Sequence, residues 1–482
     1  MKKKDLFLIQ IDFNCLSHSL RGVCSLCHQC HQVSSPLLKR TLSTLSREES
    51  DWKDKEKSSE CSSDLDSRER KSTRKESPWR QPIAWEEHMQ FPGPQLNWEY
   101  LCNPDNTDII QANISNRKGV GDIHRVHQLW KEHKKSRKKS LNIPNLSHPA
   151  SPLGEEANAK LVEKHGQQRE FNFKPKTVVE LGEALQLLKT SDVGMTTGPR
   201  TYYFIGALAE LEQALVNFTL HKLLKQGFKL VSVPDLLYPN VIDRCGFKTE
   251  GERTQVYKLP VETYGLACLA GTAEMSLAGL FLNEVLNGRD LPMKLTAVSR
   301  CYRAETSDIA EEKGIYRVHQ FTKVEMFGVT ANCNDESEQL HQLLLDVEKD
   351  LFLSLGLHFR ILDMPTEELG APAYRKFDVE TWMPGSGKWG EISSTSNCTD
   401  FQSRRLNICY LDSVGGLQFA HTVNGTACAV PRMVMALLEN NQQQNGSVVL
   451  PEVLKPYMNS GNILCPPGHQ KRFTRISGRK SS

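Results

Sequence analysis

Cys301-Tyr-Arg-Ala-Glu305 and Arg317-Val-His-Gln-Phe-Thr-Lys-Val-Glu325 are two segments separated by a polar stretch that contains Gly314. Alternate side chains of a β-strand face the same side of a sheet. If both segments are strands, Arg303 and Glu305 point to the same side of the sheet. A shared side is likewise expected for Arg317, His319, Phe321, Lys323 and Glu325. Such a face is either a solvated charged surface or a site, because charged side chains are rarely buried unpaired. The phenylalanine among the charges and the glycine at the hairpin tip favour a site.

The surrounding sequence predicts an α+β fold. Helical periodicity is found at Ala207 to Gln226 and Glu336 to Leu355. Strand-like runs are Lys229–Ser232, Leu295–Tyr302, Tyr316–Val329, Phe359–Met364, Phe377–Trp382 and Gln418–Val423. The helices stand between groups of strands, which favours a largely antiparallel sheet flanked by helices. No GxGxxG or GxxxxGK[ST] motif indicates a dinucleotide fold or a P-loop.

The composition is that of a soluble protein. The 482 residues are 39% hydrophobic with a net charge of +3, and no stretch approaches the roughly 20 apolar residues of a membrane span. We expect no membrane partner. Attraction for nucleic acid would have to come from local basic patches. Two exist, Lys131 to Lys139 and a tail holding Lys471, Arg472, Arg475, Arg479 and Lys480, although such runs can also be merely solvated.

The 14 cysteines are scattered and form no paired CxxC framework, which indicates free thiols in a reducing compartment. One cluster, Cys24-Ser-Leu-Cys-His-Gln-Cys-His31, contains a CxxCH pattern and enough Cys and His to supply the four ligands of a zinc site. No apolar periodicity surrounds the cluster to build a domain around it. We therefore expect neither zinc nor haem.

Three motifs, one of them in the two segments above, carry a resemblance to a known family. Arg303-Ala-Glu305 with Arg317-x-x-x-Phe321 resembles motif 2 of class II aminoacyl-tRNA synthetases, and Asn424 to Arg432 resembles motif 3. The end of the helix near Gln226, the strand Phe228 to Val233 and Pro234 resemble motif 1, which implies a homodimer interface. The order of the motifs implies the class II catalytic domain.

Other matches indicate the seryl branch. Gly271-Thr-Ala-Glu274 resembles a serine-binding loop, Glu391-Ile-Ser-Ser394 a strand that binds ATP and magnesium, and Asn424-Gly-Thr426 a serine-reading turn. Ala429-Val-Pro-Arg432 looks most like the animal mitochondrial enzymes. Alone, Thr272 could equally be the N-cap of a helix.

The resemblance implies a role for each of these residues. Arg303 and Arg432 would be catalytic, and Glu391 and Ser394 would hold Mg²⁺. Serine would be bound by Thr272, Ala273, Glu274, Arg303, Glu325, Asn424 and Thr426. ATP would be bound by Arg303, Ala304, Glu305, Val318, Phe321, Glu391, Ile392, Ser393, Ser394 and Arg432. The implied activity is serine–tRNA ligation with tRNA(Ser) as partner.

The chain divides into five expected regions. Residues 1–50, acid-poor from Phe13 to Arg47, read as a mitochondrial targeting segment that implies the matrix, or as an unstructured tail. Residues 51–84 are highly charged and expected to be disordered. We assign 85–151 to a small helical N-terminal region that would be a reduced tRNA-binding region, 152–460 to the catalytic domain and 461–482 to a basic, disordered tail.

The chain departs from the family at its helical arm. Between Trp130 and Asn142 there is sequence for about three helical turns, too little for a hairpin arm. A catalytically silent paralogue that binds RNA or protein is therefore an alternative, whose mark would be loss of Arg303, Glu325, Glu391 or Arg432. A threonyl or prolyl ligase is the other alternative. Threonyl enzymes hold zinc through Cys and His, and the matching stretch lacks that set.

Overall fold

A computed structural model describes residues 94–131, 142–190, 196–251, 254–260, 265–305 and 314–466. The chain separates into two compact units, Met1–Gln81 and Pro82–Ser482, and all described residues belong to the second. The predictions for residues 1–50, 51–84 and Cys24–His31 lie outside the described residues. So do those for most of the Lys131–Lys139 run and for the basic end of the tail.

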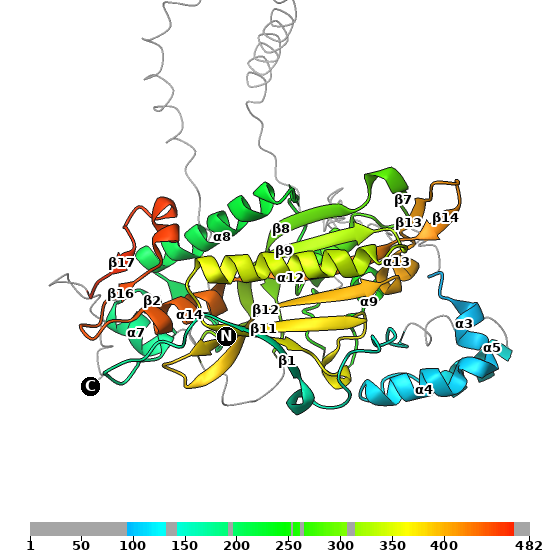
Figure 1. The fold of residues 1–482 in the computed structure, drawn as a ribbon, viewed down its shortest axis with the longest axis horizontal. Helices are drawn as coiled ribbons and strands as arrows, with labels where there is room; N and C mark the ends of the chain where they lie inside the picture. The colour runs from blue at the N-terminus through cyan, green and yellow to red at the C-terminus, as the bar shows by residue number, and fades with distance from the viewer. Residues whose placement is uncertain are drawn as a thin grey trace, which may run out of the picture. The chain divides into compact units, whose positions relative to one another are not determined.

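The second unit is built on one eight-stranded sheet (Figure 1). Its order is β1-β10-β11-β12-β15-β9-β8-β4, and every neighbouring pair is antiparallel except β4 and β8. The strands are β1 Lys160–His165, β10 Phe359–Asp363, β11 Arg375–Met383, β12 Lys388–Thr399, β15 His421–Ala429, β9 Gln320–Thr330, β8 Met293–Tyr302 and β4 Lys229–Leu230. The predicted α+β fold with a largely antiparallel sheet is confirmed.

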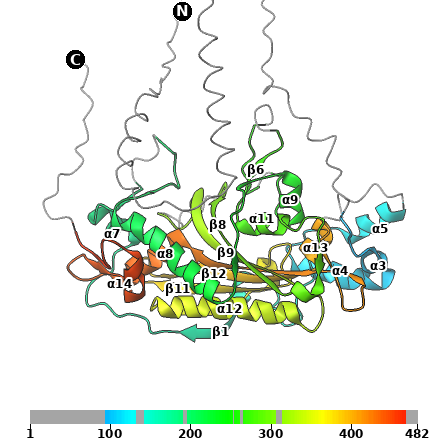
Figure 2. The ribbon, with the colours of Figure 1, turned by 90° about the horizontal axis from the view of Figure 1, so that it is seen from above.

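Long helices cover one face of this sheet. They are α8 Ala207–Lys225, α12 Glu336–Ser354 and α14 Val430–Asn441. Their apolar residues recur at helical spacing, such as Leu340, Leu344 and Leu351 of α12, and pack against Val324 and Met326 of β9. Figure 2 shows α12 running along the sheet, with α9 and α11 on its other side.

Among the described residues, the opposite face is covered only in part by helices. Helices α9 Pro239–Arg244, α11 Ala273–Gly279 and α13 Phe401–Leu406 lie over the end where a second apolar cluster joins Leu277 to Leu295 and Phe327. A small sheet of β7 Val285–Asn287, β13 Cys409–Leu411 and β14 Leu417–Phe419 lies beside them. Described residues on the rest of this face line a cavity.

Shorter elements complete the unit. The N-terminal part holds α3 Trp98–Cys102, α4 Thr107–Asn116 and α5 Ile123–Lys131, around a separate core that includes Ile110, Ile114 and Ile123. The remainder are α7 Val178–Ala184, β2 Leu188–Lys189, β3 Tyr203–Phe204, β5 Leu236–Leu237, β6 Cys268–Leu269, β16 Val448–Val449 and β17 Ile463–Leu464.

Two strand predictions need correction. The hairpin pairing ends at Tyr302 and Gln320, so Arg303, Glu305, Arg317 and His319 lie beyond the strands rather than on their face. The backbone turns away there, with Glu305 at a φ of 44°. The predicted strand Gln418–Val423 is two strands, separated where the Ala420 N–H donates to the carbonyl of Ile408 instead of the sheet.

Candidate active site

A cavity of about 430 Å³ opens on the uncovered part of the sheet face. Every predicted site residue lines it except Ala273 and Ala304. Ala273 is the buried first residue of α11, and the Ala304 N–H donates to the Gln255 carbonyl. Residues from segments far apart in sequence thus meet in one place, but their individual roles remain predictions.

Two β-bulges help to aim these side chains. In β12, Ser393 pairs with Val379 and Glu391 with Glu380, so Ile392 is an extra residue in the ladder. A bulge of this kind shifts the alternation of side chains by one position. Glu391 and Ser394 are therefore on the same side of the sheet although they are three residues apart. A second bulge in β15 lies between Thr426 and Cys428.

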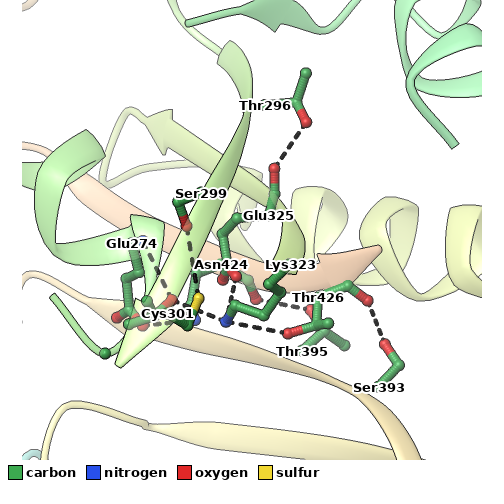
Figure 3. Close-up of polar contacts among 12 residues, drawn as sticks. Glu274, Thr296, Ser299, Cys301, Lys323, Glu325, Ser393, Thr395, Asn424 and Thr426 are labelled. Carbon is green, nitrogen blue, oxygen red and sulfur yellow. Dashed lines mark hydrogen bonds and ion pairs between the residues drawn. The ribbon is translucent and has the colours of Figure 1, made fainter. Parts of the chain in front are cut away.

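One end of the cavity is formed around a buried ion pair (Figure 3). Lys323 and Glu325 of β9 pair with each other, and only 7% and 1% of their side chains are exposed. The Lys323 Nζ also donates to the Thr272 Oγ1 at 2.8 Å and to the Thr426 Oγ1 at 3.4 Å. Burial raises the pKa of Glu325, while the Lys323 charge opposes that rise. The pair joins β9 to the start of α11 and to β15.

Glu274 is the second buried acid at this end. Its Oε1 accepts from Gln402 Nε2 at 2.6 Å, and its Oε2 accepts from Asn424 Nδ2 at 3.0 Å. Burial, and then the charge of Glu325, raise the pKa of Glu274 to about 7. The carboxyl therefore lies close to half ionised at neutral pH. A cation entering the cavity would favour its charged form.

The middle of the cavity holds Arg303 and Phe321. The Arg303 Nε donates to the Gly271 carbonyl at 3.3 Å, and its guanidinium lies 5.3 Å from the centre of the Phe321 ring. The backbone of Arg303 is fixed by His319, whose carbonyl accepts its N–H at 3.0 Å. Glu305 is buried beside it and pairs with Arg317 at 3.4 Å.

Arg432 and Glu391 form the other charged end. The Arg432 Nη1 contacts the Glu391 Oε2 at 3.1 Å and donates to the Glu391 carbonyl at 3.0 Å. Burial would raise the pKa of Glu391, but the charges of Arg432 and Lys376 outweigh it and hold the pKa at about 2. Arg432 is the third residue of α14 and directly follows Pro431, a residue that suits the first turn of a helix.

Three residues at the site had no assigned role in the prediction. Lys323 was placed on the site face by alternation, and its pairing with Glu325 follows from that position. Tyr316 lies under Arg432 at 4.4 Å, and its hydroxyl accepts the Glu391 N–H at 3.0 Å. Gln402 reaches Glu274 from α13, 128 residues along the chain, and no local sequence pattern signals such a contact.

The oxygen atoms of Glu391 and Ser394 are of the kind that a hard divalent cation prefers as ligands. Glu391 is ionised, and Ser394 lies on the same side of β12. Within the described ranges, no group of three or more His, Cys, Asp or Glu side chains is arranged to hold a metal ion. Nor does any helix in the part of the chain that the structure describes have the length and apolarity to cross a membrane.

Comparison with known proteins identifies the class. A family model described as tRNA synthetase class II core domain (G, H, P, S and T) matches residues 257–441. The crystal structure of seryl-tRNA synthetase from Pyrococcus horikoshii complexed with ATP superposes with a TM-score of 0.66 at 31% identity. The superposition covers 75% of this chain and 88% of that one. The fold is that of the class II synthetases.

Two sequence relatives narrow the assignment. The serine–tRNA ligase of Rubrobacter xylanophilus is 43% identical over 320 residues, which are 66% of this chain and 74% of that protein. The mitochondrial serine–tRNA ligase of Mus musculus is 49% identical over 327 residues, 68% of this chain. The match spans only 63% of the length of the mouse protein. The chain belongs to the serine–tRNA ligase family.

The raised pKa of Glu274 predicts how stability depends on pH. Between pH 4.5 and about 7 the unfolded carboxyl is ionised while the folded one keeps its proton, so its stabilising contribution is lost as pH rises. Glu274→Gln removes this titration. The unfolding free energy of the wild type relative to Glu274→Gln should fall by roughly 3 kcal/mol across that range. Urea unfolding at several pH values measures it, and a flat difference would contradict the assigned pKa.

Proposed function

We propose that this protein activates serine with ATP and transfers it to tRNA(Ser). One observation carries the proposal: a single cavity holds buried acids at one end, Arg303 in the middle and Arg432 at the other end. Adenylation brings an amino-acid carboxylate and a triphosphate together. A site for that reaction must offer fixed positive charge to both anions and must recognise the amino acid.

Serine recognition is assigned to the end of the cavity that contains the ion pair. Serine differs from alanine by one hydroxyl, and a site built to hydrogen-bond a hydroxyl rejects the analogue that lacks it by ~10⁴-fold or more. Glu325 and Thr426 would contact that hydroxyl, and Thr272 and Glu274 the ammonium. The ammonium would drive Glu274 to its ionised form, because its pKa of about 7 leaves it poised to lose a proton.

ATP is assigned to the remainder. Phe321 offers a stacking surface for adenine, and backbone groups near Val318 would contact the edge of the adenine ring. Arg303 would hold the serine carboxylate in line with the α-phosphate, and Arg432 would stabilise the leaving pyrophosphate. The carboxylate oxygen attacks the α-phosphorus, and the bond to pyrophosphate breaks. A tRNA ribose hydroxyl then attacks the acyl carbon, and AMP leaves.

Mg²⁺ held by Glu391 and Ser394 would neutralise part of the phosphate charge. Glu391 would otherwise lie unfavourably close to the anionic phosphates. Its partner Arg432 lies within 3.1 Å and serves the same phosphates from the protein side. No side chain has to act as a nucleophile, so catalysis would consist of positioning and charge stabilisation.

The oligomeric state and the cellular location are also proposals. A homodimer is proposed through α8 and β4, the elements that match motif 1. The mitochondrial matrix is proposed from the acid-poor N-terminal sequence and from the likeness to the mitochondrial enzymes of mouse and cattle. A silent paralogue is disfavoured, because Arg303, Glu325, Glu391 and Arg432 are all present and all line the cavity.

Serine-dependent exchange of pyrophosphate into ATP tests the proposal without tRNA. Exchange should be much faster with serine than with alanine or threonine, and equal rates with the three would overturn the assignment to serine.

Arg303→Ala should lower kcat/KM about 100-fold or more, because it removes a contact that stabilises developing charge. Arg289→Ala, an exposed arginine outside the cavity, is the matched control and should leave the rate unchanged. A loss below tenfold in Arg303→Ala would remove Arg303 from its proposed role.

The basic patches predict how tRNA is held. Each Lys or Arg that neutralises a phosphate releases counterions, so affinity should fall steeply as salt rises. Deleting residues 466–482 should weaken tRNA binding and flatten its salt dependence, while serine activation stays unchanged. Charge reversal at Lys134, Lys135, Lys138 and Lys139 should act in the same direction. Equal salt slopes for the intact and truncated proteins would show that the tail contacts no phosphate.

A further inference from the structure

Arg117, at the C-terminal end of α4, is a buried arginine outside the cavity. Only 4% of it is exposed. Its Nη1 donates to the Asn145 carbonyl at 3.1 Å and to the Ser147 Oγ at 3.3 Å. Its Nη2 donates to the Gly370 carbonyl at 2.5 Å and to the Leu369 carbonyl at 3.4 Å. A buried charge is costly unless it is hydrogen-bonded, so this guanidinium depends on those acceptors.

The acceptors on the Nη2 side belong to the wall of the cavity. Glu368 and residues 370–373 line the cavity, and none of them lies on a strand of the large sheet. Their positions therefore depend on side-chain contacts and on neighbouring loops rather than on a hydrogen-bond ladder. Arg117 reaches this wall from the N-terminal helices, about 250 residues away along the chain.

Asn145 holds the same wall from a second direction. Its N–H donates to the Ala371 carbonyl at 2.8 Å, and its Nδ2 donates to the carbonyls of Pro372 and Cys398, both at 2.9 Å. Arg117 and Asn113 in turn both donate to the carbonyl of Asn145. The end of α4, Asn145 and the wall thus form one hydrogen-bonded unit.

The wall is also closely packed against the cavity's far side. A Cβ added at Gly246, which has a φ of 94°, would come within 2.7 Å of the Pro372 Cδ. Cys398, whose carbonyl Asn145 holds, donates its thiol to the Asn424 Oδ1 at 3.6 Å. Asn424 contacts Glu274, so this wall borders the end of the cavity that carries the buried acids.

We propose that Arg117 is a positioning residue that holds the 368–373 wall of the cavity and thereby sets the affinity for serine. This inference rests on the proposed function, because it takes the buried-acid end as the serine end. It makes the N-terminal helices part of the amino-acid site and not only a platform for tRNA. Loosening the wall should weaken the binding of serine more than the binding of ATP, which lies at the Arg432 end.

The test compares Arg117→Met and the milder Arg117→Lys with the wild type in pyrophosphate exchange. In Arg117→Met the KM for serine should rise about tenfold or more, with the KM for ATP and kcat changed less than about threefold. Arg117→Lys keeps a charge without the two-pronged geometry, so its KM for serine should lie in between. Lys349→Met removes the ion pairs of Lys349 with Glu163 and Asp346 on the other face of the sheet, and as the control it should leave both KM values unchanged.

Hydrogen exchange of the free proteins gives a readout independent of activity. The amides of residues 368–371, 373 and 374, the range around Pro372, should exchange faster in Arg117→Met than in wild type or Lys349→Met. Arg117→Met could instead lower the thermal midpoint while leaving the serine KM and the amide exchange of this segment unchanged. That result would show that Arg117 is merely structural and would overturn the inference. If the wild-type protein showed no serine-dependent exchange of pyrophosphate into ATP, the proposed function would be overturned instead. In that case, faster amide exchange in Arg117→Met would still support the link to the wall, and unchanged exchange would refute it.

Discussion

The Lys323 ammonium and the Glu325 carboxylate pair on β9 with almost no access to water. Removing two charges from water is costly, and only good geometry with further hydrogen bonds repays that cost. The further bonds come from Thr272 at the start of α11 and Thr426 on β15. The pair therefore requires three segments to meet at one point of the sheet face, and the acid end of the cavity is assembled around that point.

The same logic separates the two ends of the cavity. Glu274 and Glu325 are buried acids whose pKa values are raised, so one end resists negative charge and would accept a cation such as an ammonium. At the other end Arg432 holds the pKa of Glu391 at about 2 and stacks on Tyr316. Arg303 lies between them on Phe321. Under the proposed function, this separation of charge would place a zwitterionic amino acid and a polyanion in one cavity in a fixed order.

Alternation in the sequence predicted that Phe321, Lys323 and Glu325 share a face, because every second side chain of a regular strand points to the same side of the sheet. It misplaced Arg303 and Arg317, since alternation holds only while the ladder continues and the pairing ends at Tyr302 and Gln320. The bulge at Ile392 aligns Glu391 with Ser394, and bulge positions depend on the partner strand. The contacts of Gln402 and Arg117 are long-range and leave no local pattern. Resemblance to a family supplied the site residues, but not how they are held.

A double-mutant cycle on Lys323→Met and Glu325→Gln tests most directly whether the site is assembled around this pair. Unfolding free energies and serine KM are measured for both single variants and the double variant. Each single change leaves a buried group without its partner and should cost roughly 3–5 kcal/mol. The double variant should lose less than the sum, with a coupling of about 2 kcal/mol or more, and should bind serine poorly. Additive losses, or a double variant with wild-type serine KM, would contradict the account.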